Sequence, residues 1–253
     1  MIRKRIIPVL QLYDGSLVKS INFHKLNYIG DPVNTVRIFN ESEADELVFL
    51  DLMASKRRTE PDYRTLEKIA SQCFMPLSYG GNVDSVATAK KIFNIGFEKI
   101  IINSHAYIEP EFVVKLSKIY GSQAIVGGID IMKGANGDYQ LYSESGSQKQ
   151  TTLPRDWISN LIDLGVGEIL ITDIDREGTW SGFDINYINS LVSKLQVPVI
   201  LHGGAGETAH INAALSIPNV TGVGLGSMVC YQKQGCGVLV NYPKKFIDYQ
   251  VDK

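Results

Sequence analysis

Cysteines are few in this chain of 253 residues, and long hydrophobic runs are missing. Cys73, Cys230 and Cys236 are odd in number and show no metal-ligand spacing with the four histidines. We therefore expect free thiols in a reducing cytoplasm, and neither a metal nor an organic cofactor. The apolar run in MIRKRIIPVL is far too short for a secretion signal, which also favours a cytoplasmic location.

A strong excess of charge of either sign is also missing. The net charge is −2, which argues against a nucleic-acid footprint and against a basic face that binds membranes. The expected partners are small molecules or another protein. The apolar content of 44% supports a full core, and the length suits one domain of the size of an eight-stranded barrel.

What the chain does contain is a repeat with a period of half its length. Three motifs recur 122 or 123 residues later. They are DELVFLD at 45–51 and GEILITD at 167–173, Pro76 with Gly81 and Pro198 with Gly203, and Asn103-Ser104 and Gly226-Ser227. Short apolar runs that end in Gly, Asp, Asn or Ser and repeat in this way predict a duplicated α/β barrel with its functional groups at strand C-termini.

Eight short apolar runs alternate with segments of helical period, as in parallel βα units. The predicted strands are 5–11, 46–51, 76–80, 98–103, 123–130, 168–174, 198–202 and 221–226. Helices are predicted to begin at Asp31-Pro32, Ser85, Glu109-Pro110 and Leu153-Pro154. Long polar loops, 13–30 and 133–150, follow the first and fifth strands. The prediction is a single (βα)8 TIM barrel of two half-barrels, about 1–120 and 121–253.

Glycine-rich turns are the clearest binding signal. Gly80-Gly81-Asn82 and Gly203-Gly204-Ala205-Gly206 each leave a strand just before a helix, where backbone N–H groups attract phosphate. Asn103-Ser104 and Gly226-Ser227 add donors one strand further round. The alternative, that these glycines only make tight turns, is weaker because both pairs recur at matched positions. Two phosphate pockets at one mouth would suit a phosphorylated small-molecule substrate.

Overlaying the two halves places Asp130 opposite Gln11. Asp130 lies where barrel enzymes carry an acid or base, whereas Gln11 has no titratable proton. The alternative for Asp130 is a strand-end aspartate that caps a loop, but Asp51, Asp173 and Asp175 also collect near this rim. Lys19 in the first long loop could close over an anionic substrate, or it could be a solvated lysine.

Four charges of alternating kind stand at the opposite ends of the strands. They are Arg5, Glu46, Lys99 and Glu168. Each alone would be expected in solvent, but together they could form a ring of salt bridges across the barrel floor and act as a gate.

The residues resemble those of the HisF family, the cyclase subunit of imidazole glycerol phosphate synthase, over essentially the whole chain. The resemblance is carried by KRII, DGxxVK at 14–19, NF at 22–23, GDPV at 30–33, DELVFLD at 45–51, GSQA at 121–124, RDW at 155–157, GEIL at 167–170, IDREGTxSGFD at 174–184 and GGAG at 203–206. It implies a (βα)8 barrel that docks its floor on a HisH-like glutaminase in a heterodimer. Ammonia would then pass through the barrel core to a bisphosphorylated ribosyl substrate at the mouth.

The resemblance also implies roles for single residues. Arg5, Glu46, Lys99 and Glu168 match the ammonia gate, and the catalytic aspartates match Asp130 and position 11, which is Gln. The substrate- and phosphate-binding residues implied are Lys19, Gly81, Asn82, Asn103, Ser104, Ser145, Thr172, Glu177, Gly203, Gly204, Gly226 and Ser227. Asn82 stands where the family has a second glycine, and Tyr79, Met53 and His202 give the mouth unfamiliar side chains.

The floor thus matches the family while the mouth departs from it. Loss of one acid–base partner commonly costs on the order of 10²–10⁴ in rate. The first hypothesis is therefore a HisF-like protein of glycosyl amidation, which delivers ammonia for conversion of an acetamido to an acetamidino sugar, with a separate sugar amidotransferase as a further partner. The alternatives are an ordinary cyclase of histidine biosynthesis and a non-catalytic phosphometabolite-binding activator of a glutaminase.

Overall fold

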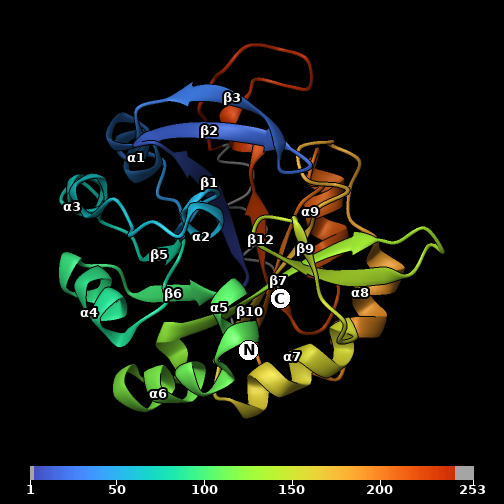
Figure 1. Cartoon of the computed structure of the whole chain (residues 1–253). Coiled ribbons are helices and arrows are strands. Elements are labelled where there is room, and N and C mark those ends of the chain that lie inside the picture. Colours follow the sequence, from blue (N-terminus) through green and yellow to red (C-terminus); the bar gives the residue numbers. More distant parts are fainter. Residues whose placement is uncertain (1–2, 243–253) are drawn as a thin grey trace.

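A closed barrel of parallel strands forms the centre of the computed structural model, which describes residues 3–242 (Figure 1). Within these residues eight strands close the barrel, since β7 pairs with β10 and β12 pairs with β1. The barrel strands are β1 (Arg5–Tyr13), β4 (Leu47–Asp51), β5 (Leu77–Gly80), β6 (Lys99–Ile102), β7 (Ile125–Lys133), β10 (Glu168–Asp173), β11 (Val199–His202) and β12 (Val220–Leu225). The single (βα)8 barrel predicted from the sequence is confirmed.

Helices surround the barrel and cover the outer face of the sheet (Figure 1). They are α1 (Pro32–Glu41), α2 (Ala54–Arg57), α3 (Tyr63–Ala70), α4 (Val86–Ile95), α5 (Ser104–Ile108), α6 (Pro110–Tyr120), α7 (Pro154–Asp163), α8 (Ile185–Val192), α9 (Thr208–Leu215) and α10 (Ser227–Cys230), with a 3-10 turn, η1, at Ser122–Ala124. The predicted starts are confirmed: Asp31 and Ser85 cap α1 and α4 by accepting from backbone N–H groups, and prolines occupy the first turns of α6 and α7. Among residues 3–242, the helices are too short or too polar to cross a membrane.

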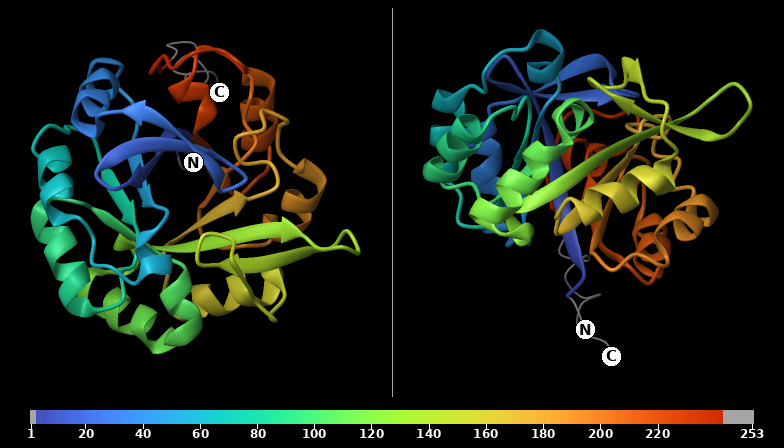
Figure 2. Two further views of the ribbon diagram at one scale, coloured as in Figure 1. Left: turned by 45° about the horizontal axis from the view of Figure 1, so that its top comes forward. Right: turned by 60° about the horizontal axis from the view of Figure 1, so that its bottom comes forward.

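The two segments predicted as long loops contain antiparallel strands. The first forms β2 (Ser16–Ile21) and β3 (His24–Gly30), and the second forms β8 (Tyr139–Ser143) and β9 (Gln148–Lys149). Each hairpin pairs with a barrel strand that runs on beyond the rim, β1 to Tyr13 and β7 to Lys133. Both therefore lie at the C-terminal end of the barrel strands, where they cover part of the mouth (Figure 2).

Two apolar layers hold the barrel together. The outer layer packs the sheet against the helices. The inner layer fills the barrel between its two ends and consists of Ile7, Val9, Val48, Ile101, Val126, Leu170 and Ile200, with Leu50 packed against it. The inner side chains belong to alternate positions of their strands, as expected when successive residues point to opposite faces. The floor and the mouth are thus separated by a column of apolar side chains.

Candidate functional site

The four charges predicted for the barrel floor lie together in one ring, in which the carboxylates are buried and the Arg5 and Lys99 side chains are 18% and 19% exposed. Arg5 pairs with Glu46 at 2.7 Å and with Glu168, and Lys99 pairs with Glu168 at 2.8 Å and with Glu46 at 3.2 Å. Glu46 and Glu168 are 2% and 4% exposed, so neither carboxylate is solvated. Burial lowers the pKa of Arg5, but the two carboxylates raise it further than burial lowers it. Every charge in the ring therefore has a partner of opposite sign.

Two hydroxyl groups extend this ring of ion pairs. Ser78 on β5 donates to Glu46 at 2.8 Å, and Arg5 donates to Thr221 on β12 at 3.2 Å. These contacts satisfy lone pairs and N–H groups that ion pairs alone would leave open, which limits the cost of burying charge. The ring closes the floor directly below the inner apolar column.

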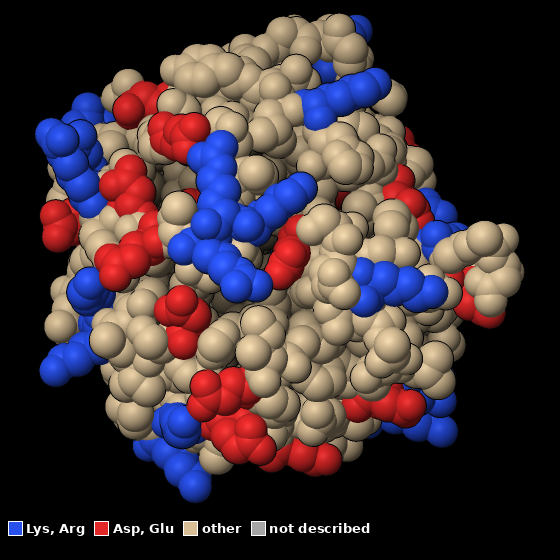
Figure 3. Space-filling view, viewed as in Figure 1, with Lys and Arg blue, Asp and Glu red and all other residues tan. Residues whose placement is uncertain are grey.

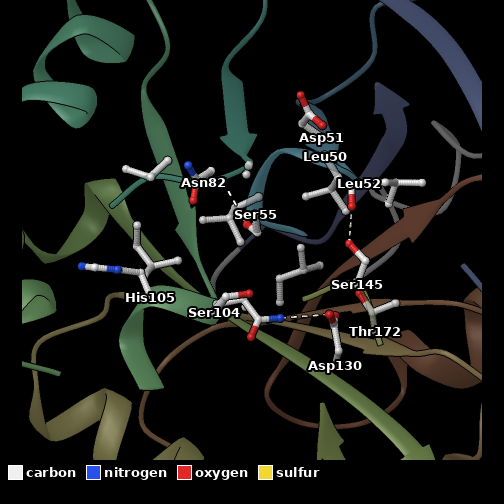
Figure 4. A pocket seen from close by; sticks show the side chains of 18 of the residues that line it. Leu50, Asp51, Leu52, Ser55, Asn82, Ser104, His105, Asp130, Ser145 and Thr172 are labelled. Atoms are coloured by element: carbon white, nitrogen blue, oxygen red, sulfur yellow. Dashed lines mark hydrogen bonds between the residues drawn. The ribbon is translucent and has the colours of Figure 1, made fainter. Parts of the chain in front are cut away.

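Asp130 lies at the opposite end of the barrel, in a pocket of the mouth (Figure 4). Asn103 donates through Nδ2 to its Oδ2 at 2.9 Å, and Thr172 is its neighbour in register on β10. Burial raises the pKa of Asp130 to about 7, although the hydrogen bond from Asn103 opposes this shift. A carboxyl group that titrates near neutral pH can act as a proton acceptor or donor, as the prediction for Asp130 requires.

Gln11 does not line this pocket, because the first hairpin covers it. Its side chain is 1% exposed, accepts from the Ser20 N–H at 2.7 Å, and donates to Glu177 at 3.1 Å. The amide thus uses one acceptor and one donor, which a carboxylate could not do. In this structure Gln11 holds two segments of the chain together.

Lys19 and Glu177 form a buried ion pair beside Gln11. Ser20 donates to Glu177 Oε2 at 2.8 Å, and the Phe23 N–H approaches the same oxygen at 3.3 Å. We call Gln11, Lys19, Ser20 and Glu177 the latch cluster, because it ties the β2–β3 hairpin to the segment after β10. Burial lowers the pKa of Lys19 to about 7, and the nearby Cys230 opposes this shift. The Glu177 carboxylate is fully buried and paired, so it does not replace the missing acid at position 11.

His202 adds a buried imidazole to the mouth. Its Nδ1 lies 3.3 Å from the Thr172 hydroxyl, and burial, with a smaller contribution from Lys19, lowers its pKa to about 3. The imidazole is therefore neutral at physiological pH. Cys230 lies near Lys19 on the same side, and burial raises its pKa to about 11. A thiol with this pKa is a weak nucleophile.

The first glycine-rich turn is occupied by contacts within the chain. The Asn82 N–H donates to Ser55 Oγ at 3.1 Å, and the Asn82 amide donates to the Thr59 carbonyl at 2.8 Å. Ser104 accepts from the Glu144 N–H at 3.0 Å. Asn82 adopts a φ of 44°, a conformation that favours glycine. One pocket is lined by five of the predicted binding residues, Gly81, Asn82, Asn103, Ser104 and Ser145. The Ser145 hydroxyl donates to the Leu52 carbonyl.

The second glycine-rich turn is buried. Gly203 and Gly204 have φ values of 88° and 122°, and a Cβ on either would overlap a backbone carbonyl, of Asp173 or Gly182. At Gly226 a Cβ would lie 2.8 Å from the Cε of Lys19. Close packing therefore explains these glycines, and their predicted phosphate role stays a prediction. Ser227 lines a separate cavity that also contains Lys233.

Two of the acids expected near the rim have structural partners outside the pocket. Asp173 accepts from the Tyr139 hydroxyl at 2.9 Å, and Asp175 accepts from the Lys133 N–H at 2.7 Å. Asp51 does line the pocket, where it accepts from the N–H groups that begin α2. Ser20 and Ser55 were not predicted from the sequence. The only signal for them was position: Ser20 directly follows Lys19, and Ser55 lies four residues after Asp51.

Metal-ligating residues do not gather anywhere in residues 3–242: no three His, Cys, Asp or Glu side chains there could hold an ion. The groups that the structure does place at the mouth can supply acid–base and hydrogen-bonding chemistry. A parallel (βα)8 barrel with these groups at the C-terminal ends of its strands belongs to the class of barrel enzymes.

Comparison with known proteins identifies the family. The model described as "Histidine biosynthesis protein" matches residues 5–234, so the chain belongs to that family. It is 40% identical over 243 residues to the "Putative imidazole glycerol phosphate synthase subunit hisF2" of Pseudomonas aeruginosa, covering 96% of this chain and 97% of that protein. The "Putative imidazole glycerol phosphate synthase subunit HisF" of Leptospira borgpetersenii is 42% identical over 244 residues, 96% of each chain.

The "Imidazole glycerol phosphate synthase subunit HisF" of Streptococcus sanguinis is 35% identical over 231 residues, 91% of this chain and 92% of that protein. The resemblance to HisF inferred from the sequence motifs is thus confirmed over nearly the full length.

Proposed function

We propose that this chain accepts glutamine-derived ammonia from a HisH-like glutaminase and delivers it to an acetamido sugar of a bacterial surface polysaccharide. One observation carries the proposal: the floor keeps a complete ring of ion pairs, whereas at the mouth position 11 carries an amide that belongs to the latch cluster. Ammonia entry is thereby retained without the second acid of a cyclase.

The inner column supports the route for ammonia. Its side chains are aliphatic from the floor to the mouth, so a neutral ammonia molecule crosses at far lower cost than an ammonium ion. The ring of ion pairs has to open for entry, and docking of the glutaminase on the floor would drive this opening. Ammonia then arrives beside Asp130, which can take a proton from it as the new C–N bond forms.

The acceptor chemistry requires a further partner. Conversion of an acetamido to an acetamidino group replaces the carbonyl oxygen by nitrogen, and an amide oxygen leaves only after activation. A separate sugar amidotransferase would supply that activation by moving a phosphoryl or adenylyl group from a nucleoside triphosphate to the amide oxygen, which then leaves as phosphate or nucleoside monophosphate. This barrel supplies the ammonia and the base. The partners proposed are therefore a HisH-like glutaminase and a sugar amidotransferase.

The acceptor is tested by giving the protein two substrates in turn, with an ammonium salt at alkaline pH. With the bisphosphorylated ribosyl substrate of the cyclases, we expect turnover on the order of 10²–10⁴ lower than that of a HisF that has both aspartates. With an acetamido sugar, its amidotransferase and a nucleoside triphosphate, we expect ammonia-dependent formation of the amidine, detected by mass spectrometry. Cyclase turnover equal to that of the reference HisF would contradict the proposal.

Ordinary ring closure is the second candidate function, and the pKa of Asp130 near 7 favours it. In that case Asp130 is the principal base, with water or Gln11 assisting. The two relatives described above as putative synthase subunits share about two fifths of their residues with this chain, and this level of identity does not select one acceptor over the other. The substrate comparison separates the two functions.

The ammonia route is tested by Lys99→Ala. Loss of Lys99 leaves Glu46 and Glu168 paired with Arg5 alone, so we expect glutamine-dependent transfer to change at least about fivefold while transfer from added ammonium salt stays the same. Lys115→Ala is the matched control, since Lys115 forms an exposed ion pair at 2.7 Å on α6. Equal effects of Lys99→Ala on the two nitrogen sources would contradict a gate.

A further inference from the structure

The mouth pocket around Asp130 offers hydrogen-bond acceptors in excess (Figure 4). Asn103 Oδ1 is buried and has no hydrogen-bond partner, because its Nδ2 is turned to Asp130. Asp130 accepts only at Oδ2 among the described residues, which leaves Oδ1 for a ligand. A buried acceptor without a partner costs about 1–3 kcal/mol, so a ligand that donates to these oxygens is favoured.

Three donors of the same pocket are already engaged. The Asn82 N–H, its side-chain amide and the Ser145 hydroxyl all donate to oxygens of the chain. The pocket's described lining contains two carboxylates, Asp51 and Asp130, and neither Lys nor Arg. A phosphate group accepts but does not donate hydrogen bonds when fully ionised, and it would stand beside like charges here.

Cations on this side of the molecule lie outside the pocket. Lys56 and Arg57 in α2, and Arg58 after it, are exposed at the rim, where basic side chains gather over the mouth (Figure 3). Arg57 donates to Asp14 at 2.7 Å and to the Tyr13 hydroxyl at 2.8 Å. The Lys and Arg side chains are therefore at the surface, while the pocket itself is lined by acids, amides, hydroxyls, the imidazole of His105 and apolar side chains.

We propose that this pocket binds an uncharged sugar group, whose hydroxyls and acetamido N–H donate to Asn103 and Asp130. Phe23 and Leu50 line the same pocket and offer apolar surface to the C–H groups of a sugar ring. This inference rests on the proposed function, because the sugar group that it assigns to the mouth pocket is the acceptor of that function. It places a neutral group where the resemblance to HisF places a phosphate.

Saturation-transfer NMR tests this with N-acetylglucosamine as the neutral probe. We expect binding to the whole protein, a reduction in affinity of about tenfold in Asn103→Leu, and no change in Asn94→Leu, a matched control on the outer helix α4. Inorganic phosphate should not displace the sugar from the unaltered protein. In the double variant Ser55→Ala, Asn82→Gly, which frees the N–H at position 82, phosphate should compete at least about tenfold better.

Two results would overturn the inference. One is no detectable binding at sugar concentrations about 20-fold above a Kd of roughly 1 mM, which is typical of weak sites. The other is displacement of the sugar by phosphate in the unaltered protein. Failure of the proposed function gives a different pattern. In that case the sugar binds in an Asn103-dependent way, but Lys99→Ala affects both nitrogen sources equally. Coupling to glutamine without sugar binding would reject only the assignment of the pocket.

Discussion

Asp130→Asn is expected to reduce ammonia-dependent transfer by a factor on the order of 10²–10⁴, whichever acceptor the protein uses. The change keeps the size of the side chain and the contact with Asn103 but removes the group that takes up the proton. Because the group that takes up the proton is removed, the loss should appear in kcat. Asp138→Asn, an exposed aspartate in the β7–β8 turn, is the control and should leave the rate unaltered.

The pH dependence gives this prediction a second readout. Because the pKa of Asp130 is about 7, the rate at a fixed concentration of free ammonia should rise as pH increases from 6 to 8 and then level off. Free ammonia must be held constant, since its own concentration increases with pH. Asp130→Asn should remove the inflection near pH 7; an inflection that persists in the variant would assign it to another group.

The contribution of Asp130 to the stability of the fold should fall as pH increases, whereas the rate should rise. A carboxyl group whose pKa is raised from 3.8 to about 7 by burial stabilises the fold most below pH 4, and this contribution is lost as pH rises through 7. The gain in stability of Asp130→Asn over the unaltered protein should therefore be larger at pH 8 than at pH 5 by on the order of 2–3 kcal/mol. Urea denaturation at the two pH values measures this.

The barrel strands could be predicted from the sequence because each is a short apolar run bounded by turn residues. The predicted 198–202 and 46–51 differ by one residue from β11 and β4. The β2 and β3 strands could not be predicted in this way, because β2 is polar at Ser16, Lys19 and Ser20 and gains its regularity from pairing with the extension of β1. The half-barrel boundary near residue 120 stays a prediction.

The floor ring could be predicted from the sequence, whereas the latch cluster could not. The floor charges stand at strand starts, and closure of a parallel barrel brings all strand starts to one end, so spacing alone places them together. Glu177 lies 158 residues from Lys19 in a segment between a strand and a helix, and nothing in the spacing indicates that they meet. Lys19 was predicted to contact substrate or solvent, whereas the structure places it in a buried ion pair.

Glu177→Leu is expected to lower the free energy of unfolding by about 3–5 kcal/mol. The variant removes one partner of a buried pair and leaves the Lys19 ammonium, 2% exposed, without its counter-charge. Gln11 and Ser20 would each lose their hydrogen bond to the same carboxylate, so Asn22, which bonds to the Ile174 and Asp175 carbonyls, would be left to hold the hairpin to the segment after β10. Urea denaturation gives the change in stability, and hydrogen exchange of β2 shows whether the hairpin opens.

Removal of both charges distinguishes pairing from general damage to the site. In the double variant Lys19→Met, Glu177→Leu no buried charge is left unpaired, so we expect it to regain much of the stability lost in Glu177→Leu. Glu109→Ala, which breaks the exposed pair with Lys115, should cost at most about 1 kcal/mol. If the double variant were as unstable as the sum of Glu177→Leu and Lys19→Met, the ion pair would not be what holds the hairpin over the mouth.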